Sequence, residues 1–309
     1  MKLLPASSGD LIADRRADYA EMLFADGEHG AAAELMLGAL ELAPGWAMGW
    51  FRLGEFQEAA GAPAEAERAW RMVLKLEPAD RPGAALKLEL IGAAPAADAP
   101  PSAFVETLFD QYAEKFDDAL VKTLRYRGPE LIAEAIHAAA PGRRFSHAVD
   151  LGCGTGLMGE RLRPFVGHLE GHDISAAMLK KAGARKVYDR LVKSDLQRLA
   201  LETRSADLIT AADVFIYVGA LERVVATVGS ALLPGGLFAF SVERHDGPQD
   251  FTLRGTRRYA HSEDYVRRIL AKADMKIIAL SADTIRMDRA EPVAGLFVLA
   301  SSFGGFANG

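Results

Sequence analysis

Short apolar runs alternate with amphipathic stretches over the last two thirds of the chain. Apolar runs bounded by turn-forming residues predict buried β-strands, and apolar positions spaced three or four residues apart predict helices. Strands are expected at residues 148–151, 169–172, 191–192, 208–211 and 237–241, and helices at residues 104–120, 129–140 and 262–272. This alternation predicts an α/β fold with a doubly wound, parallel sheet.

Two apolar runs close to the C-terminus depart from that order. Residues 276–280 and 295–300 have no helix-length segment between them. Strands that follow each other without a crossover helix pair in antiparallel fashion. The sheet is therefore expected to end in an antiparallel pair at its edge.

The first hundred residues repeat themselves at a spacing of 34. The pairs at this spacing are Gly27 and Gly61, Ala32 and Ala66, Leu40 and Leu74, Leu42 and Leu76, and Pro44 and Pro78. A period of 34 in a helical context is typical of tetratricopeptide repeats, and the second copy, with Trp50-x-x-Leu53-Gly54 and then Trp70, resembles that family. The resemblance implies helical hairpins whose small residues lie where two helices touch. A generic alanine-rich helical bundle is the alternative.

A stretch rich in proline and alanine follows the repeats. Residues 94–103 contain Pro95, Pro100 and Pro101 and little apolar bulk, which is typical of a semi-rigid linker. We therefore predict a small all-α domain over residues 1–93, a linker over 94–103 and an α/β domain over 104–309.

Composition narrows the class of protein. The chain has 309 residues, of which 50% are hydrophobic and 25% charged, and these proportions exclude wholesale disorder. The apolar stretch near Met1 is too short for a secretory signal, and no apolar run reaches the roughly 18 residues that span a bilayer. Cys153 is the single cysteine, so it cannot form an internal disulfide. A soluble, cytoplasmic protein without membrane contact is expected.

Charge is unevenly distributed. Residues 1–103 carry 9 Lys and Arg against 16 Asp and Glu, whereas the remaining residues carry 27 against 26. Binding to a phosphate backbone depends on clustered Lys and Arg. Nucleic acid is therefore not an expected partner.

A glycine-rich turn follows the first predicted strand. The run Val149-Asp150-Leu151-Gly152-Cys153-Gly154-Thr155-Gly156 ends a buried strand and opens a helix. Glycines let the backbone turn sharply and approach a ligand closely, and ligands bind at the carboxyl ends of the strands in open α/β sheets. By itself such a turn also fits a tight strand-to-helix connection. Cys153 is interpreted as a small packing residue rather than a nucleophile.

An acidic residue stands at the expected end of the second strand. Asp173 lies 21 residues after Gly152, where a carboxylate can accept hydrogen bonds from both hydroxyls of a ribose. Capping of the next helix is the alternative role, for which Ser175 is better placed. A nicotinamide dinucleotide is disfavoured, because its fingerprint needs a glycine where this chain has Leu157.

The loop and the segments after it resemble class I S-adenosylmethionine-dependent methyltransferases over residues 104 to 301. The glycine run is similar to that family's Asp-Leu-Gly-x-Gly-x-Gly loop, and residues 172–179 look like its ribose-binding turn. The resemblance implies S-adenosylmethionine as cofactor, S-adenosylhomocysteine as product and a Rossmann-like sheet. The cofactor-binding residues that it implies are Tyr112, Asp150, Gly152, Cys153, Gly154, Gly156, Asp173, Ile174, Met178, Asp195, Leu196 and Asp213.

The resemblance also suggests individual roles. Met178 would lie near the adenine, Asp195 would accept from the adenine amino group, and Leu196 would donate a backbone N–H. Asp213 would end the strand beside the transferred methyl. Tyr112, in Phe109-Asp110-x-Tyr112-Ala113-x-x-Phe116-Asp117, would belong to a helical lid over the cofactor. That segment, together with the repeats, resembles bacterial predicted methyltransferases that carry tetratricopeptide repeats.

The catalytic candidates are residues that can take a proton from an acceptor. Tyr217, His245 and His261 lie outside the predicted strands, and each has an alternative structural or solvated role. Arg254, Arg257 and Arg258 are positioned to bind an anionic acceptor or to form a solvated loop. The histidines His29, His137, His147 and His168 show no metal-ligand spacing, so no metal site is expected.

Two functions remain open at this point. The first is methyl transfer to a small-molecule acceptor, with the helical repeats contacting a protein partner or a second copy of the chain. The second is a non-catalytic scaffold whose methyltransferase-like domain binds cofactor without turnover. The intact set Asp150, Gly152, Gly154, Asp173 and Asp195 favours the enzyme. The acceptor, the atom methylated and the oligomeric state are left open.

Overall fold

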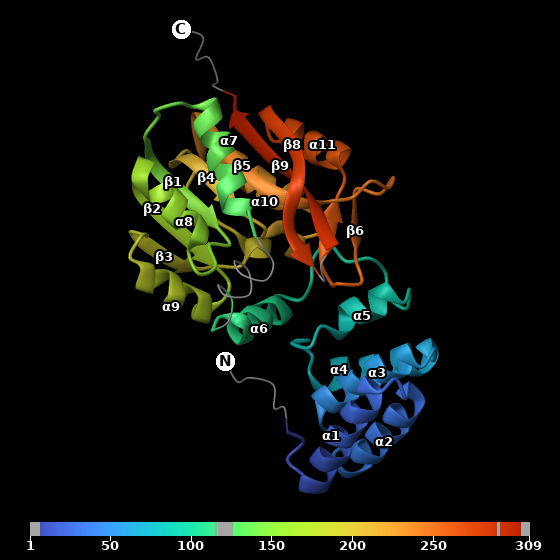
Figure 1. Ribbon diagram of the computed structural model, residues 1–309. Helices are drawn as coiled ribbons and strands as arrows, with labels where there is room; N and C mark the ends of the chain where they lie inside the picture. Colours follow the sequence, from blue (N-terminus) through green and yellow to red (C-terminus); the bar gives the residue numbers. More distant parts are fainter. Residues whose placement is uncertain (1–6, 115, 117–125, 289–290, 304–309) are drawn as a thin grey trace. The chain divides into compact units, whose positions relative to one another are not determined.

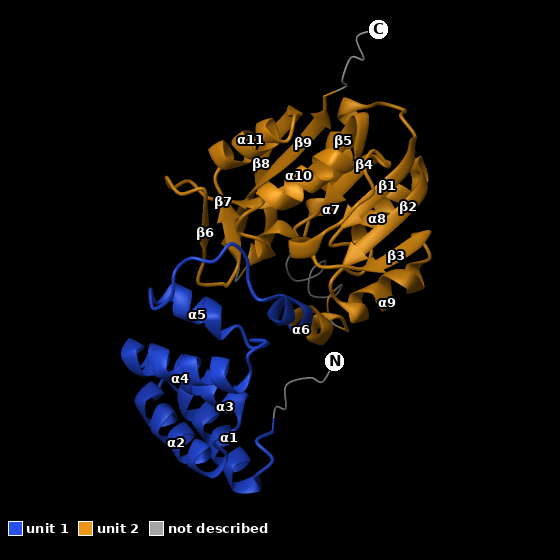
Figure 2. Ribbon diagram, turned by 180° about the vertical axis from the view of Figure 1, so that it is seen from behind, with its two compact units in different colours: residues 1–107 blue, residues 108–309 orange. Residues whose placement is uncertain are grey.

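The computed structural model describes residues 7–114, 116, 126–288 and 291–303. It divides into two compact units, residues 1–107 and residues 108–309 (Figure 2). The division falls within helix α6 (Ser102–Tyr112). Among the described residues, no helix combines the length and the apolar character needed to span a membrane.

The first unit is built of paired helices. They are α1 (Leu11–Ala25), α2 (His29–Leu42), α3 (Ala47–Ala59), α4 (Pro63–Leu76) and α5 (Ala84–Leu90). Small residues are buried where α1 meets α2, among them Ala20 and Ala32. A Cβ atom at Gly54 would lie 2.3 Å from the Trp70 indole nitrogen, so only glycine lets α3 pack this closely on α4. The predicted small residues thus lie at helix contacts.

The second unit contains the sheet (Figure 1). Its strands are β1 (Phe145–Leu151), β2 (Val166–Asp173), β3 (Arg190–Lys193), β4 (Ala206–Ala211), β5 (Leu232–Arg244), β6 (Phe251–Leu253), β7 (Tyr259–His261), β8 (Met275–Asp288) and β9 (Glu291–Ser302). The strands β3, β2, β1, β4 and β5 lie side by side and are parallel. Strand β9 runs antiparallel between β5 and β8. The predicted doubly wound sheet with an antiparallel end is confirmed.

Helices cover both faces of this sheet. On one face, α7 (Gly128–Ala139) and α8 (Leu157–Leu162) share an apolar cluster with Ala148, Leu169 and Leu208. On the other face, α10 (Glu222–Ala231) and α11 (Glu263–Lys272) share a cluster with Val149, Ile209 and other strand residues. Helix α9 (Ala176–Arg185) connects β2 to β3. Strands buried from both sides explain the continuous apolar runs in the sequence.

The structure corrects three details of the predicted elements. Strand β5 begins at Leu232 and ends at Arg244, so it is longer than the run predicted over residues 237–241. The helix predicted over residues 104–120 ends at Tyr112, and residues 117–125 lie outside the described residues. The antiparallel pair of β6 and β7 was not predicted, because strands of three residues are too short to give a clear pattern.

Candidate active site

The carboxyl ends of four parallel strands meet at one edge of the sheet (Figure 1). Asp150 near the end of β1 is paired with Gly171 of β2 and Thr210 of β4, and Asp173 at the end of β2 is paired with Lys193 of β3. This pairing brings together the glycine loop after β1, Asp173, Asp195 and Asp213, which follow or end the four strands. The edge is where open α/β sheets bind ligands.

Among the described residues, the glycine loop is tightly packed at one glycine and less tightly at the next. Gly152 and Gly154 have positive φ angles of 64° and 53°. A Cβ atom at Gly152 would lie 2.2 Å from Cγ2 of Val214, so this glycine permits the loop to touch the end of β4. At Gly154 the nearest described atom would be Cε1 of Phe116, at 3.7 Å. The described residues thus leave room for a small group beside the Gly154 backbone.

Asp173 holds the loop from the neighbouring strand. Its Oδ2 accepts a hydrogen bond from Gly154 N (2.8 Å), and its Oδ1 accepts one from Ser175 N (2.8 Å). Burial raises the pKa of Asp173 to about 6, and the Asp110 carboxylate adds to the rise. Each carboxylate oxygen has a further lone pair, so the side chain can still accept from a ligand hydroxyl.

Asp110 attaches the end of α6 to the turn after β2. Its Oδ1 accepts from Ser175 Oγ (2.6 Å) and from Ala177 N (3.3 Å) at the start of α9. Ser175 Oγ also accepts from Met178 N, so Ser175 is the N-cap of α9. The helix before the sheet therefore contacts the segment that carries Asp173.

Asp150 lies beneath the loop and is buried. The Tyr188 hydroxyl donates to its Oδ2 and the Thr210 hydroxyl donates to its Oδ1, both at 2.7 Å. Burial raises the pKa of Asp150 to about 6, against the lowering effect of these two hydrogen bonds. The structure thus places the Asp150 side chain in an internal network that supports the loop.

The other predicted cofactor residues surround this centre. Cys153 is buried, its backbone N donates to the His172 carbonyl (2.9 Å), and burial raises the pKa of its thiol. Met178 is buried on α9, whereas Ile174 is half-buried next to Asp173. Asp195 is the N-cap of the short helix that starts at Leu196, and it accepts from Gln197 N. Gly156 is the N-cap of α8.

Asp213 is held by an arginine from a distant strand. Arg286 on β8 donates through Nη1 to both carboxylate oxygens of Asp213, at 2.6 and 2.7 Å, and through Nη2 to Glu243 on β5. The Asp213 backbone N donates to Ser241 Oγ (2.9 Å). Burial raises the pKa of Asp213, and the Arg286 charge opposes that rise. The end of β4 is therefore tied to β5 and β8.

Aromatic rings lie beside the loop. The Phe109 ring lies edge-on to Phe116 (centroids 6.0 Å apart) and to Tyr217 (5.2 Å). Tyr217 is buried in a 3-10 helix after β4 (Phe215–Tyr217). Tyr112 is 54% exposed at the end of α6. In the described residues, Phe116 rather than Tyr112 is the ring closest to Gly154.

The two candidate histidines differ in environment. His261 is not in a loop but is fully buried in β7, and its Nε2 donates to the carbonyls of Val218 (3.0 Å) and Gly219 (2.9 Å). Burial lowers the pKa of His261 to about 4, so the ring is neutral and a weak base. His245 is half-buried after β5, and its Nε2 lies 3.2 Å from Gln249 Oε1.

The candidate arginines Arg254 and Arg258 lie close to carboxylates. Arg254 lies 3.4 Å from Glu243 and donates to the Arg244 carbonyl, and Arg258 lies 3.1 Å from Asp288. The β6–β7 pair therefore places both side chains near carboxylates of the sheet. Arg257 has a positive φ of 60° in the turn between the two strands.

Sequence reasoning missed several residues of this region. Asp110, Phe109 and Phe116 stood within the quoted helical motif, but nothing in their spacing predicts contact with Ser175 or Gly154. Arg286 lies 73 residues from Asp213, and it carries no local signal.

Residues 149–240 match the sequence profile described as a methyltransferase domain. The matched stretch begins in β1 and ends in β5, so it contains the glycine loop, Asp173, Asp195 and Asp213. The C-terminal part of the chain carries a class I S-adenosylmethionine-dependent methyltransferase domain.

Curated proteins with similar sequences are named as methyltransferases. The chain is 28% identical over 140 residues to malonyl-[acyl-carrier protein] O-methyltransferase of Enterobacter lignolyticus, covering 45% of this chain and 55% of the relative. It is 33% identical over 153 residues to trans-aconitate 2-methyltransferase of Paracidovorax citrulli, covering 46% and 59%. The chain thus spans little more than half the length of these relatives.

A solved structure shares the fold of the domain. It is a complex between the Haloferax volcanii Trm112 methyltransferase activator and a methyltransferase, with a TM-score of 0.50 and 19% identity. The match covers 63% of this chain and 97% of that chain.

Proposed function

We propose that residues 108–309 bind S-adenosylmethionine at the glycine loop and transfer its methyl group to a small-molecule acceptor. The proposal is supported by the methyltransferase-domain match and by the small-molecule acceptors that the relatives' names state, trans-aconitate among them. The acceptor itself is to be identified. The released product is S-adenosylhomocysteine.

In this proposal the carboxyl edge of the sheet receives the cofactor. Asp173 accepts from the ribose hydroxyls, Asp195 accepts from the adenine amino group, and the backbone around Gly154 contacts the methionine part. The bound sulfonium supplies an activated methyl group. The protein's main contribution is then to align an acceptor atom with the methyl–sulfur bond. Tyr217 and His245 are our candidates for taking a proton where the acceptor must lose one.

The observation that carries the proposal is the room that the described residues leave for a small group at Gly154. Gly152 faces the side chain of Val214, but a side chain at Gly154 would project into a volume that no described atom approaches closer than 3.7 Å. A methyl group there would compete with the cofactor and leave the core untouched. Gly154→Ala therefore separates ligand binding from folding.

The test compares Gly154→Ala with Gly142→Ala. Gly142 also has a positive φ (71°) and open surroundings, but it lies before β1, at the other end of that strand. An alanine in this conformation costs roughly 1–2 kcal/mol, so both variants should melt a few degrees lower than the wild type. S-adenosylhomocysteine should raise the melting temperatures of the wild type and of Gly142→Ala. The melting temperature of Gly154→Ala should rise much less. Equal shifts in both variants would contradict cofactor binding at this loop.

Turnover distinguishes the enzyme from the scaffold. Methyl transfer from labelled S-adenosylmethionine should be measured against trans-aconitate, malonyl-acyl carrier protein and a fractionated metabolite extract. A melting shift with S-adenosylhomocysteine but no transfer to any fraction favours the non-catalytic scaffold. Transfer that is lost in Gly154→Ala and kept in Gly142→Ala supports the enzyme.

We also propose that the helices of residues 1–93 are tetratricopeptide-like, that residues 94–103 link them to the enzyme, and that they contact a protein. Support comes from the 34-residue period and from four apolar side chains of α1 that are more than half exposed, namely Leu11, Ile12, Tyr19 and Met22. Light scattering of the full chain and of Tyr19→Glu/Met22→Glu tests self-association. A chain starting at Pro101 should still bind S-adenosylhomocysteine, and loss of binding in a folded chain would show that the helices belong to the site.

A further inference from the structure

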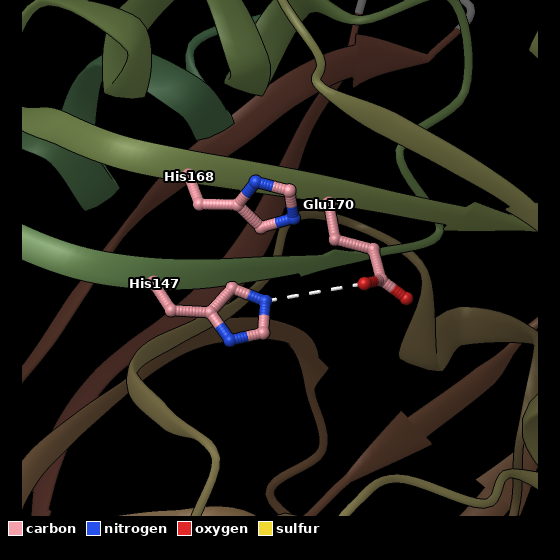
Figure 3. Close-up of side chains that lie close together, drawn as sticks. All are labelled: His147, His168 and Glu170. Atoms are coloured by element: carbon pink, nitrogen blue, oxygen red, sulfur yellow. Dashed lines mark ion pairs between the residues drawn. The ribbon is translucent and has the colours of Figure 1, made fainter.

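Three potential metal-ligating side chains lie together on β1 and β2, toward the amino ends of these strands. Parallel pairing sets His147 of β1 opposite His168 of β2, and Glu170 follows two residues later on the same face. Figure 3 shows the Nε2 atoms of both imidazoles pointing toward the Glu170 carboxylate. One ligand atom from each residue lies within 4.8 Å of the others. The sequence expectation of no metal site overlooked this cluster, because strand pairing rather than chain spacing brings it together.

His147 presents an unused lone pair to this cluster. Its Nδ1 lies 2.9 Å from the Ser205 carbonyl oxygen, which can only accept, so Nδ1 carries the proton. When the ring carries this proton alone, Nε2 is a bare acceptor. Among the residues that the structure describes, none offers a hydrogen bond to this buried atom. An N–H bound to a backbone carbonyl is the arrangement that orients metal-binding histidines.

The other two residues are also positioned as ligands. Glu170 is buried; its Oε1 lies 2.7 Å from His172 Nε2, and its Oε2 lies 3.2 Å from Arg190 Nη1 and 3.9 Å from His147 Nε2. The Arg190 side chain is 64% exposed, so it can move away from Glu170. His168 is half-exposed, with Nδ1 3.8 Å from an Asp189 carboxylate oxygen. A carboxylate near the other ring nitrogen of a histidine makes that histidine a stronger metal ligand.

A network without metal accounts for only part of this arrangement. His172 and Arg190 satisfy the Glu170 charge without any ion. Among the described residues, they leave Nε2 of His147 without a hydrogen bond and 3.9 Å from the Glu170 carboxylate, and a cation bound between the two would contact both. The cluster is open to solvent on the His168 side, so an ion can enter.

We propose that His147, His168 and Glu170 bind one divalent transition-metal ion, with zinc as the best match. Two imidazoles and a carboxylate form a donor set that zinc uses with three protein ligands, leaving one position for water. Ligand atoms at about 2.1 Å from a tetrahedral ion lie about 3.4 Å apart. The cluster must therefore contract by up to about 1.4 Å, and rotation of the half-exposed His168 ring allows this.

The test titrates zinc into the full-length, untagged chain after removal of metals with a chelator. Competition with a chromophoric chelator gives affinity and stoichiometry, and cobalt in place of zinc gives visible absorption bands that report the ligand geometry. We expect one tight ion per chain. His147→Ala, His168→Ala and Glu170→Gln should each weaken binding by more than the roughly 10- to 100-fold that loss of an outer partner costs.

His29→Ala is the matched control, because His29 is half-buried on α2 and lies outside the cluster. It should bind zinc like the wild type. Circular dichroism and thermal melting without metal establish that each variant is folded; His168→Ala replaces an exposed ring and decides the question if His147→Ala does not fold. Wild-type binding in His168→Ala and Glu170→Gln, or the absence of a one-to-one complex, would overturn the proposal. The zinc titration uses neither cofactor nor acceptor, so its result does not depend on the proposed methyl transfer.

Discussion

Replacement of Arg286 by methionine tests the charge network behind the end of β4. The Arg286 side chain is 1% exposed, and its partners Asp213 and Glu243 are 10% and 3% exposed. Methionine keeps most of the side-chain volume and removes the charge. The buried Asp213 then loses the arginine that donates to both of its oxygens, and Glu243 keeps only the more distant Arg254, at 3.4 Å. Breaking a buried ion pair in this way costs about 3–5 kcal/mol. For a unit of this size each kcal/mol corresponds to about 2–4 °C, so its melting temperature should fall by about 6–20 °C.

The pH dependence of that loss has a definite sign. Burial already raises the pKa of Asp213, and removal of the arginine charge raises it further. A carboxyl whose folded-state pKa lies above its unfolded value stabilises the fold below the unfolded pKa and loses that contribution as pH rises through the folded value. The stability that Arg286→Met loses relative to the wild type should therefore be larger at pH 8 than at pH 5.

The assay uses two optical signals on the full chain. The three tryptophans, Trp46, Trp50 and Trp70, all lie in the first unit, so their fluorescence reports that unit alone. Circular dichroism reports both units. Arg286→Met should lower the circular dichroism transition and leave the tryptophan transition in place.

Arg267→Met is the control for this assay. Arg267 is half-exposed and pairs with Glu263 on α11 at 2.6 Å, and an exposed pair contributes about 0–1 kcal/mol. A loss below about 1 kcal/mol in Arg286→Met, or a loss equal to that of Arg267→Met, would refute the reasoning. A loss of stability in Arg286→Met that becomes smaller between pH 5 and pH 8 would also refute the reasoning.

Two further predictions concern the cofactor edge. Burial raises the pKa of Asp150 from 3.8 to about 6. Ionisation of this buried carboxyl as the pH rises between these two values therefore destabilises the wild type by up to about 3 kcal/mol. Denaturant unfolding should therefore show Asp150→Asn gaining stability relative to the wild type between pH 4.5 and pH 7.5, and a constant difference would contradict the raised pKa. Tyr112→Ala should leave the melting temperature of the ligand-free protein nearly unchanged, because the ring is 54% exposed, and should weaken S-adenosylhomocysteine binding in calorimetry. Unchanged affinity would remove Tyr112 from the proposed lid.

Much of the second unit could be predicted from local patterns. Apolar runs located β1, β2, β3, β4 and the central part of β5, because strands buried on both faces need apolar residues at successive positions. The glycine run located the turn after β1, because positive φ angles require glycine there. Helix α11 was located by its amphipathic spacing after Ser262, which is its N-cap. Each of these features depends on residues close together in the chain.

The contacts that complete the site depend instead on how the strands assemble. Asp213 and Arg286 meet across 73 residues, and Asp110 reaches Ser175 across 65. His147 and His168 become neighbours because β1 and β2 pair in parallel and in one particular register. A shift of β2 by one residue relative to β1 would turn His168 to the other face of the sheet, away from His147. The sequence by itself determined the strands and the loop between them, and tertiary structure decided which charged groups meet, because pairing register and burial arise only when distant segments pack together.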